Sequence, residues 1–412
     1  EKPGDRVFSP ASAVENSPFA SPGAREFLLS RGSCNLSLAE LHPLSEQTAR
    51  ISGNSPSFIR LSPTALEKYA GCMFSYFGKY LLKLSDNKKH SFSYSEIGTF
   101  VHKTLEVFVS ERMGTGSFEK ADDSFIENWV DEFTSAYINK ICGGEAAGAE
   151  RFAYMTNRLK TTLKLLLKNI SDELSCSSFA PEMLEYSFRE SPAEYIVNKD
   201  VKASLGGVID RVDIYKDKES GDTYVRVVDY KTGNKSFSQS RIEKGLDMQL
   251  LLYLFAICEK ISGKPASAVY LSSKLETVAV SPDMNDEAKE KKLNSAFKRS
   301  GIVLDETALI NALDPSMDKR FSPFTAKGDG KPSASKSRVS RDEIEELKET
   351  THGLLKTFAG LISDGVMDVS PLKSGSSVNA CEHCELKPVC RLSREKSVER
   401  SSPPERRPSE NE

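Results

Sequence analysis

Apolar residues recur at helical spacing through much of the first half of the chain. The segment 66–82 is rich in aliphatic and aromatic side chains. The pair before it, Ser62 and Pro63, is a favourable helix start, because serine caps the first turn and proline fits within it. The pattern therefore predicts a helix here, and it predicts further helices from about residue 96, over 123–143 and over 150–176.

The pattern changes to strand-like segments further along the chain. A helix should lie among these strands, starting near Asp247 and ending at Gly263, because Pro265 stands just beyond it as a stop signal. The other expected elements are strands over 182–189, 205–216, 223–230 and 268–271, a loop over 310–337 and a helix over 340–363.

The order of these elements indicates the fold class. Helices followed by strands, a helix and another strand predict an α/β core with a helical insertion in front of it. Residues 1–57, rich in Ser, Pro and Gly, are expected to be an irregular linker or the remnant of an upstream domain. We expect one folded domain over 58–395 and a disordered, charged tail over 396–412.

Composition narrows the class of protein only modestly. The 412 residues are 38% hydrophobic and 28% charged, which is typical of a globular chain, and a net charge of −3 gives no global basic field for nucleic acid. A local basic groove remains compatible with that balance. We find no signal segment and no run of 18 apolar residues, so we expect a cytoplasmic protein without a membrane partner. The chain begins with Glu1 instead of Met, which is compatible with a fragment of a longer protein.

Two carboxylates and a lysine form the most informative pattern in the sequence. Successive side chains of a strand point to opposite faces, so Asp229 and Lys231 share a face that Asp210 can approach from the preceding strand. Two close carboxylates stay ionised together only when a cation lies between them. Oxygen ligands favour Mg²⁺ or Mn²⁺, which would hold a scissile phosphate and lower the pKa of a bound water. The pattern predicts a metal-dependent phosphodiesterase, in which Lys231 orients the water or neutralises charge in the transition state.

Further residues are weaker candidates. Gln249 and Tyr253 lie four positions apart on one helix face, where they could contact the attacking water, a base or a phosphate. An ordinary helix surface explains this pair equally well. His102 could complete the metal shell as a neutral imidazole, although a lone helical histidine is more often a surface or core residue. Asp213 is a less certain ligand, and Arg211 fits an ion pair better.

Eight cysteines in a long chain without a signal segment point to metal ligands more than to disulfides. Cys381, Cys384 and Cys390 form a C-x₂-C-x₅-C run, in which three thiolates can bind one centre. The fourth ligand is either His383, giving a zinc site, or the remote Cys72, giving an iron–sulfur cluster. A buried thiol that acts as a small hydrophobe is the ordinary alternative for Cys72. That interpretation is kept for the other cysteines, which are Cys34, Cys142, Cys176 and Cys258.

Taken in order, these motifs resemble one family. The chain is similar to PD-(D/E)XK nucleases of the RecB type, and within them to the subset with an iron–sulfur staple, over roughly 58–392. The residues that carry the resemblance are Gly98 and His102, Gly207, Asp210 and Arg211, the run Asp229-Tyr230-Lys231-Thr232-Gly233, Gln249 and Tyr253, the segment from Leu61 to Cys72, and the three closing cysteines. Met73 departs from the family, where a proline often follows the first cysteine.

The resemblance implies more than the residues alone establish. It implies a restriction-endonuclease-like core, with a mixed sheet flanked by helices, a helical insertion and a cysteine-ligated cluster. It also implies resection of DNA double-strand breaks for recombinational repair, with an AddA-type helicase–nuclease partner and cleavage of the 5′-ended strand. By resemblance, the catalytic residues are His102, Asp210, Asp229, Lys231, Gln249 and Tyr253, the Mg²⁺ or Mn²⁺ ligands are His102, Asp210, Asp229 and the Tyr230 carbonyl, and the [4Fe–4S] ligands are Cys72, Cys381, Cys384 and Cys390.

Two other functions are compatible with the same residues. The chain could be a DNA-binding scaffold that has lost activity, although the intact carboxylates and lysine argue against this. It could also be a stand-alone RecB-like nuclease that works without a helicase. The segment 327–332 lacks the leading glycine and the Ser or Thr of a Walker A motif, so we expect this chain alone neither to bind ATP nor to unwind DNA.

Overall fold

The fold is described here from a computed structural model of the chain. The residues that the structure describes are 58–84, 94–116, 118–142, 150–199, 201–233, 235–273, 284–285, 297, 299–315, 321–324, 335–374, 378–382, 384–390 and 400–405. Within these ranges, every helix is too short or too polar to cross a membrane.

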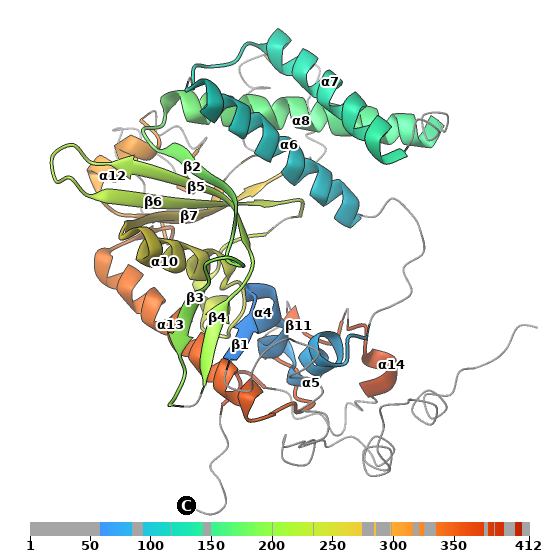
Figure 1. Ribbon diagram of the computed structural model, residues 1–412, viewed down its shortest axis with the longest axis vertical. Helices are drawn as coiled ribbons and strands as arrows, with labels where there is room; N and C mark the ends of the chain where they lie inside the picture. The colour runs from blue at the N-terminus through green and yellow to red at the C-terminus, as the bar shows by residue number, and fades with distance from the viewer. Residues whose placement is uncertain are drawn as a thin grey trace, which may run out of the picture.

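A six-stranded mixed sheet forms the centre of the molecule (Figure 1). Its strand order is β2-β5-β6-β7-β8-β9, in which β5 is antiparallel to both neighbours and β6 is parallel to β7. Valine and other apolar residues alternate with a few charged ones along β5 and β6, and most side chains of both strands are buried. The strands span Ala180–Ser187 (β2), Val208–Lys216 (β5), Thr223–Lys231 (β6), Lys264–Ser272 (β7), Arg299–Leu304 (β8) and Arg338–Val339 (β9).

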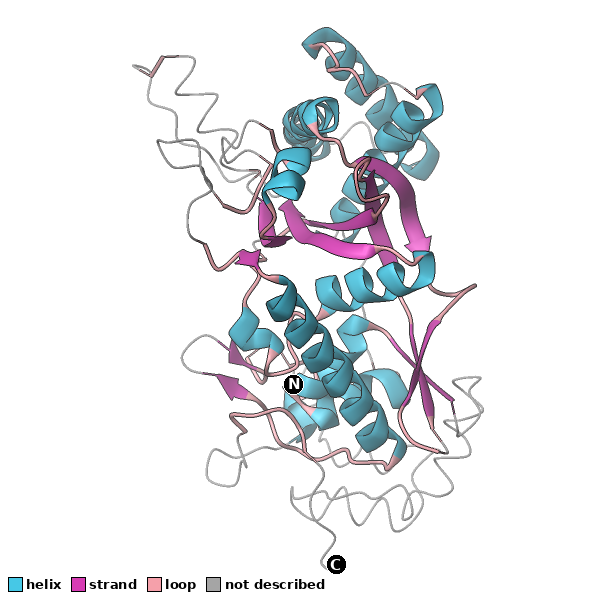
Figure 2. Cartoon of the chain, turned by 90° about the vertical axis from the view of Figure 1, so that its left-hand side faces the viewer, coloured by secondary structure: helices cyan, strands magenta, loops and turns pink. Residues whose placement is uncertain are grey.

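Helices cover both faces of this sheet and divide the apolar core into two clusters. The view turned by 90° shows the sheet between the two helical layers (Figure 2). The helices α10 (Gln249–Ile261) and α13 (Arg341–Ser363) pack on one face with the larger cluster. The opposite face is covered by α6 (Tyr94–Thr115), α7 (Asp123–Cys142) and α8 (Glu150–Cys176), which form the helical insertion expected from the sequence.

A second, three-stranded sheet lies beside the central one and begins with the first described segment. Its order is β1-β4-β3, with β1 (Phe58–Leu61) parallel to β4 (Lys202–Leu205) and β3 (Ala193–Ile196) antiparallel to β4. The strand expected over 205–216 is mostly β5, and only its first residue, Leu205, belongs to β4. Gly207, with a positive φ of 122°, stands between them.

The helix expected over 66–82 is not continuous. Ser62 caps α4 (Pro63–Gly71) as predicted, since its hydroxyl accepts a hydrogen bond of 3.2 Å from the N–H of Ala65. Cys72 then adopts an extended conformation with φ −165° and ψ 118°, which breaks the helix. The chain resumes as α5 (Met73–Tyr76) and a π-helical turn, η1 (Phe77–Leu81). The break turns the Cys72 side chain towards the C-terminal segment.

The remaining described elements are short and lie in the C-terminal half or beside α10. The helix α12 (Thr307–Leu313) extends into the segment expected to be a loop. The expected tail, 396–412, includes the described Arg400, whose guanidinium donates to the carbonyls of Ser370 and Ala70. Residues 1–57 and 327–332 lie outside the described part of the chain. The other elements are α9 (Gln239–Ile242), β10 (Lys373–Ser374), β11 (Val378–Asn379) and α14 (Lys387–Cys390).

Candidate active site

The pairing of β5 with β6 brings two carboxylates together at the ends of their strands. Arg211 lies opposite Val228, so the same register places Asp210 opposite Asp229. Both residues are buried, with exposed fractions of 7% and 1%. The Oδ2 atom of Asp210 accepts a hydrogen bond of 2.6 Å from the backbone N–H of Tyr230, which fixes its direction. The approach of the two acids expected from strand alternation is therefore present in the fold.

Asp229 is held by a cation and an amide. The Nζ atom of Lys231 lies 2.5 Å from Oδ2 of Asp229, and Nε2 of Gln249 donates to Oδ1 at 2.6 Å. Lys231 also donates to Oε1 of Gln249 at 3.2 Å, which closes a triangle of three side chains. Gln249 is the first residue of α10, so the start of this helix is aligned with the end of β6. Sequence analysis predicted all three residues for the site, and the structure brings them together.

His102 lies against the other carboxylate. It projects from α6, and its Nδ1 atom is 3.2 Å from Oδ1 of Asp210. The approach of this helix to the strand end does not require glycine at position 98, because a Cβ atom there would make only an ordinary contact of 3.7 Å with Thr232. The His102 ring also packs edge-on against Tyr230, with ring centroids 5.9 Å apart. The contact with Asp210 places this lone helical histidine within the site.

Glu185 is a member of the site that sequence analysis did not predict. It lies in β2, where Leu184 pairs with Arg211 and Tyr186 with Ile209, so Glu185 stands opposite Asp210. One ligand atom from each of His102, Glu185 and Asp210 lies within 4.8 Å of the other two. Such a group of one imidazole and two carboxylates can hold a divalent cation. Asp229, whose oxygens contact Lys231 and Gln249, is not part of this set of three.

The backbone at Glu185 supports a specialised role. Its φ of +46° places a non-glycine residue in the left-handed region, which carries a conformational cost of about 1 kcal/mol or more. Strained residues of this kind cluster at functional sites, where surrounding structure holds them in place. A register irregularity between Pro181 and Met183 precedes it in the same strand.

The pKa values in this group reflect burial and crowding of negative charge. Burial raises the pKa of Glu185 to about 7, and the charge of Asp210 adds to the effect. Burial likewise raises the pKa of Asp229 to about 6, with Asp210 adding to it and Lys231 opposing it. Burial lowers the pKa of His102, but its hydrogen bond to Asp210 and the acid's charge outweigh this and leave the value raised. The carboxylates can all ionise at neutral pH only when a cation compensates them.

Tyr253 has a different environment from the one expected. The sequence allowed contact with a base or a phosphate, or an ordinary place on the helix surface, but the residue is only 4% exposed. Its ring stacks on Phe188 with centroids 5.8 Å apart, and its hydroxyl bonds to the backbone of Val208 and to Gln249. The tyrosine therefore supports Gln249 and the backbone before β5 from inside the core, and little of its ring is left for a nucleic-acid base.

Four cysteines from the two ends of the described chain line a single cavity. Cys72, Cys381, Cys384 and Cys390 surround a space of about 70 Å³, together with Ser75 and other side chains. The Oγ atom of Ser75 lies 3.7 Å from Sγ of Cys384, and the N–H of Leu372 donates to the carbonyl of Gly71 at 2.7 Å. These contacts hold the C-terminal segment against the break between α4 and α5.

The chemistry of this cavity fits a metal centre. Burial raises the pKa of the Cys72 thiol, and the nearby Cys384 adds to the effect, so thiolates here need a compensating cation. Cys258 is buried in the larger apolar cluster and Cys176 lies in α8, and neither lines this cavity. His383, the alternative fourth ligand, and Cys34 lie outside the described residues, and the side chain of Cys142 is not described.

Comparison with known proteins assigns the class. The family model of the PD-(D/E)XK nuclease superfamily matches residues 60–391, and the chain belongs to this superfamily. The mixed sheet flanked by helices is the α/β core expected for it.

Among curated proteins, the chain is similar to one of the subunits of the ATP-dependent helicase/deoxyribonuclease of Clostridioides difficile (strain 630), with 29% identity over 369 residues, or 86% of this chain and 31% of that protein. The same-named subunits of Thermoanaerobacter sp. (strain X514) and Clostridium kluyveri (strain NBRC 12016) are 28% and 29% identical over 81% of this chain and 30% of their own length. The chain thus spans about a third of these relatives.

Proposed function

We propose that this chain is a metal-dependent nuclease domain that hydrolyses phosphodiester bonds of DNA. One observation carries the proposal: His102, Glu185 and Asp210 converge within coordination distance next to the triangle of Asp229, Lys231 and Gln249. Membership of a nuclease superfamily supports the same chemistry. So does the buried cluster of acids, because its negative charge needs a cation to compensate it. The domain would extend over 58–395, with 1–57 as a linker or remnant.

Each residue has a chemical role in this proposal. His102, Glu185 and Asp210 would hold the divalent ion, with Asp229 and the carbonyl of Tyr230 as further ligands. A bound Mg²⁺ or Mn²⁺ supplies a Lewis acid for the scissile phosphate and lowers the pKa of a coordinated water.

The triangle beside the metal ligands would complete the catalytic group. Lys231 would orient the water or neutralise charge that develops on the phosphate oxygens. Gln249 would keep Asp229 and Lys231 in place through its hydrogen bonds to both side chains. Tyr253 would in turn fix Gln249 through a hydrogen bond from the core.

We propose that the cysteine cavity holds a [4Fe–4S] cluster with a structural role. Four cysteines that line one cavity match the ligand set of such a cluster. A zinc ion bound tetrahedrally by four thiolates is the alternative that metal analysis tests. The cluster would join Cys72 to the C-terminal cysteines and so clasp the two ends of the domain.

The names of the relatives guide the biological context. They are subunits of helicase/deoxyribonucleases, and we propose that this domain acts likewise, as part of the AddB-type component of an AddAB-type complex, during double-strand break resection and recombinational repair. An AddA-type helicase–nuclease would be its partner, and the 5′-ended strand of unwound DNA its substrate.

The test is cleavage of end-labelled single-stranded DNA by the purified chain. We expect Mg²⁺ or Mn²⁺ to support cleavage, EDTA to stop it, and Asp210→Ala to abolish it while circular dichroism remains unchanged. Glu219→Ala is the matched control, because this exposed acid lies in the hairpin between β5 and β6, away from the site. A wild-type chain that binds DNA without cutting it in either metal would instead support the scaffold interpretation.

The cluster has its own measurement on the same sample. Anaerobically purified protein should be brown and contain about four iron atoms per chain. Stoichiometric zinc in a colourless protein would reverse this part of the proposal and leave the nuclease assignment intact.

A further inference from the structure

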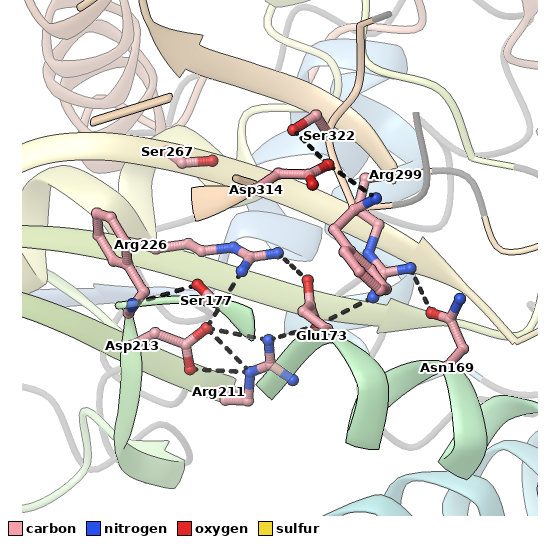
Figure 3. A network of polar contacts seen from close by, with 12 residues as sticks. Asn169, Glu173, Ser177, Arg211, Asp213, Arg226, Ser267, Arg299, Asp314 and Ser322 are labelled. Carbon is pink, nitrogen blue, oxygen red and sulfur yellow. Dashed lines mark hydrogen bonds and ion pairs between the residues drawn. The ribbon is translucent and has the colours of Figure 1, made fainter. Parts of the chain in front are cut away.

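A fully buried ionic network lies behind the carboxylate pair, on the opposite face of the central sheet. Its centre is Glu173 of α8, which has no exposed surface and faces guanidinium groups from three different strands (Figure 3). The Nη2 atom of Arg211 in β5 lies 3.1 Å from Oε2 of Glu173, and Nη2 of Arg299 in β8 lies 2.9 Å from the same oxygen. Arg226 in β6 contacts the other oxygen, Oε1.

A second carboxylate ties the two central strands together directly. Asp213 of β5 lies 2.9 Å from Nε of Arg211 and 3.7 Å from Nη1 of Arg226, its partner across the ladder. Asn169, one turn before Glu173 on α8, accepts a hydrogen bond of 2.5 Å from Arg299. The helix is thereby fixed to three strands of the sheet through charged groups.

The network is closely connected to the candidate metal site through the backbone. Arg211 is the residue after Asp210, and Arg226 stands three positions before Asp229 on the same strand. Because strand side chains alternate, both arginines point away from the face that carries the two acids. Any shift of β5 against β6 would move the guanidinium groups and the metal-binding carboxylates together.

Stability alone does not explain such a network. Removing charges from water is expensive, and well-packed apolar side chains of similar volume often replace a buried ion pair without loss. The same helix also contributes apolar side chains to the core, with Leu163, Leu166 and Leu167 fully buried. Burial raises the pKa of Glu173, but the three arginines outweigh it and leave the pKa well below its usual range, so the carboxylate stays charged.

We propose that Glu173 is a positioning residue for the metal site. Through Arg211 and Arg226 it fixes β5 relative to β6, so that Asp210 and Asp229 stay opposite each other. Directional bonds at fixed places along the strands specify this register, whereas apolar contacts tolerate small displacements. The inference rests on the proposed function, because it assumes that the two acids bind a divalent ion.

The test separates positioning from general stability. Binding of Mn²⁺ to the purified chain is measured by electron paramagnetic resonance, well below the unfolding temperature of each variant. Glu173→Gln should weaken Mn²⁺ binding about tenfold or more, as loss of groups that orient metal ligands commonly does. It should also lower kcat, while KM for single-stranded DNA changes about twofold or less. Leu167→Ala is the matched control from the same helix, and it should lower the unfolding temperature but leave Mn²⁺ binding unchanged.

A second variant covers the case in which Glu173→Gln does not fold. Arg226→Lys keeps the positive charge but loses the planar fork, and it should weaken Mn²⁺ binding in the same way. A folded variant of either kind with wild-type Mn²⁺ affinity overturns the positioning role and leaves the nuclease assignment standing. A wild-type chain that fails to bind Mn²⁺ at millimolar concentration overturns the proposed function and this inference together.

Discussion

Gln249 donates a hydrogen bond of 2.6 Å to Asp229, although the two residues belong to a helix and a strand 20 positions apart. The other oxygen of Asp229 lies 2.5 Å from Lys231. A buried carboxylate thus has one amide donor and one cation, while Asp210 across the ladder faces His102. The two acids are therefore held differently, and substitutions around them should have separable effects.

Replacement of Lys231 should separate catalysis from metal binding. Lys231→Ala is expected to lower kcat at least about 100-fold, since removal of one charge-stabilising donor has effects of that size. Mn²⁺ binding should persist or strengthen, because a competing cation next to Asp229 is lost. Titration with Mn²⁺ and single-turnover cleavage on the same preparation measure both effects. Loss of Mn²⁺ binding in this variant would mean that Lys231 organises the ligands.

The raised pKa of Asp229 predicts a pH dependence for the metal-free protein. With a folded-state pKa of about 6 against an ordinary value of 3.8, folding favours the protonated acid. The associated stability is present below the ordinary value and is lost as pH rises through about 6. In EDTA at pH 7.5, Asp229→Asn should therefore stabilise the chain by roughly 1–3 kcal/mol, and near pH 3 it should have little effect.

Thermal unfolding at the two pH values checks this expectation, and added Mg²⁺ should favour the wild type at pH 7.5. An equal difference between the proteins at both pH values would show that Asp229 titrates normally.

The sequence predicted much of this site. Strand alternation placed Asp229 and Lys231 on one face, and the resemblance to the nuclease family added Gln249, which the structure places beside them. Glu185 was not predictable in this way. Its place opposite Asp210 depends on the register of β2, which shifts at an irregularity between Pro181 and Met183.

Tertiary packing also overrode two local interpretations. The apolar and aromatic pattern around Cys72 predicts one continuous helix, yet the residue is extended, because its side chain faces a cavity shared with Cys384. Tyr253 shares a helix face with Gln249, but the sheet and Phe188 cover that face. A sequence window cannot contain these distant partners.

Glu185→Gln tests the residue that only the structure revealed. The metal concentration for half-maximal cleavage should rise about 10- to 100-fold, because a carboxylate ligand becomes a weaker neutral one. Activity at saturating metal should recover in part, and DNA binding in EDTA should not weaken. The exposed Glu182→Gln in the same strand is the control. Identical metal titrations for both variants would exclude Glu185 from the coordination shell.

Replacement of one cysteine ligand should release the C-terminal segment from the break between α4 and α5. Cys384→Ser is expected to lose the iron and the colour. It should also lower the free energy of unfolding by up to about 5 kcal/mol, which is the entropic cost of closing the long loop between Cys72 and the C-terminal cysteines. Limited proteolysis should then cleave near the C-terminal segment first. Cys258→Ala should keep its iron, because this thiol lies in the apolar cluster. Full iron content in Cys384→Ser would remove this residue from the ligand set.

A side chain at position 207 should destabilise the protein for two independent reasons. The Gly207 φ of +122° is rare for any L-residue, and a Cβ atom here would lie 2.2 Å from the hydroxyl of Tyr253. Gly221 is the matched control, since it has a φ of +74° but nothing within 4 Å of an added Cβ. Gly221→Ala should therefore cost about 1 kcal/mol through backbone strain alone.

Gly207→Ala should cost several times more, by roughly 3 kcal/mol or above, because the clash adds to the strain. Combining Gly207→Ala with Tyr253→Phe removes the clashing oxygen. The urea midpoint of unfolding should then recover in part, and the stability that remains lost should correspond to at least the cost of backbone strain. Gly207 lies three residues before Asp210, and Tyr253 one turn after Gln249. The double variant should consequently regain stability more fully than kcat, whereas equal recovery of both would mean that the backbone at Gly207 does not position the acid.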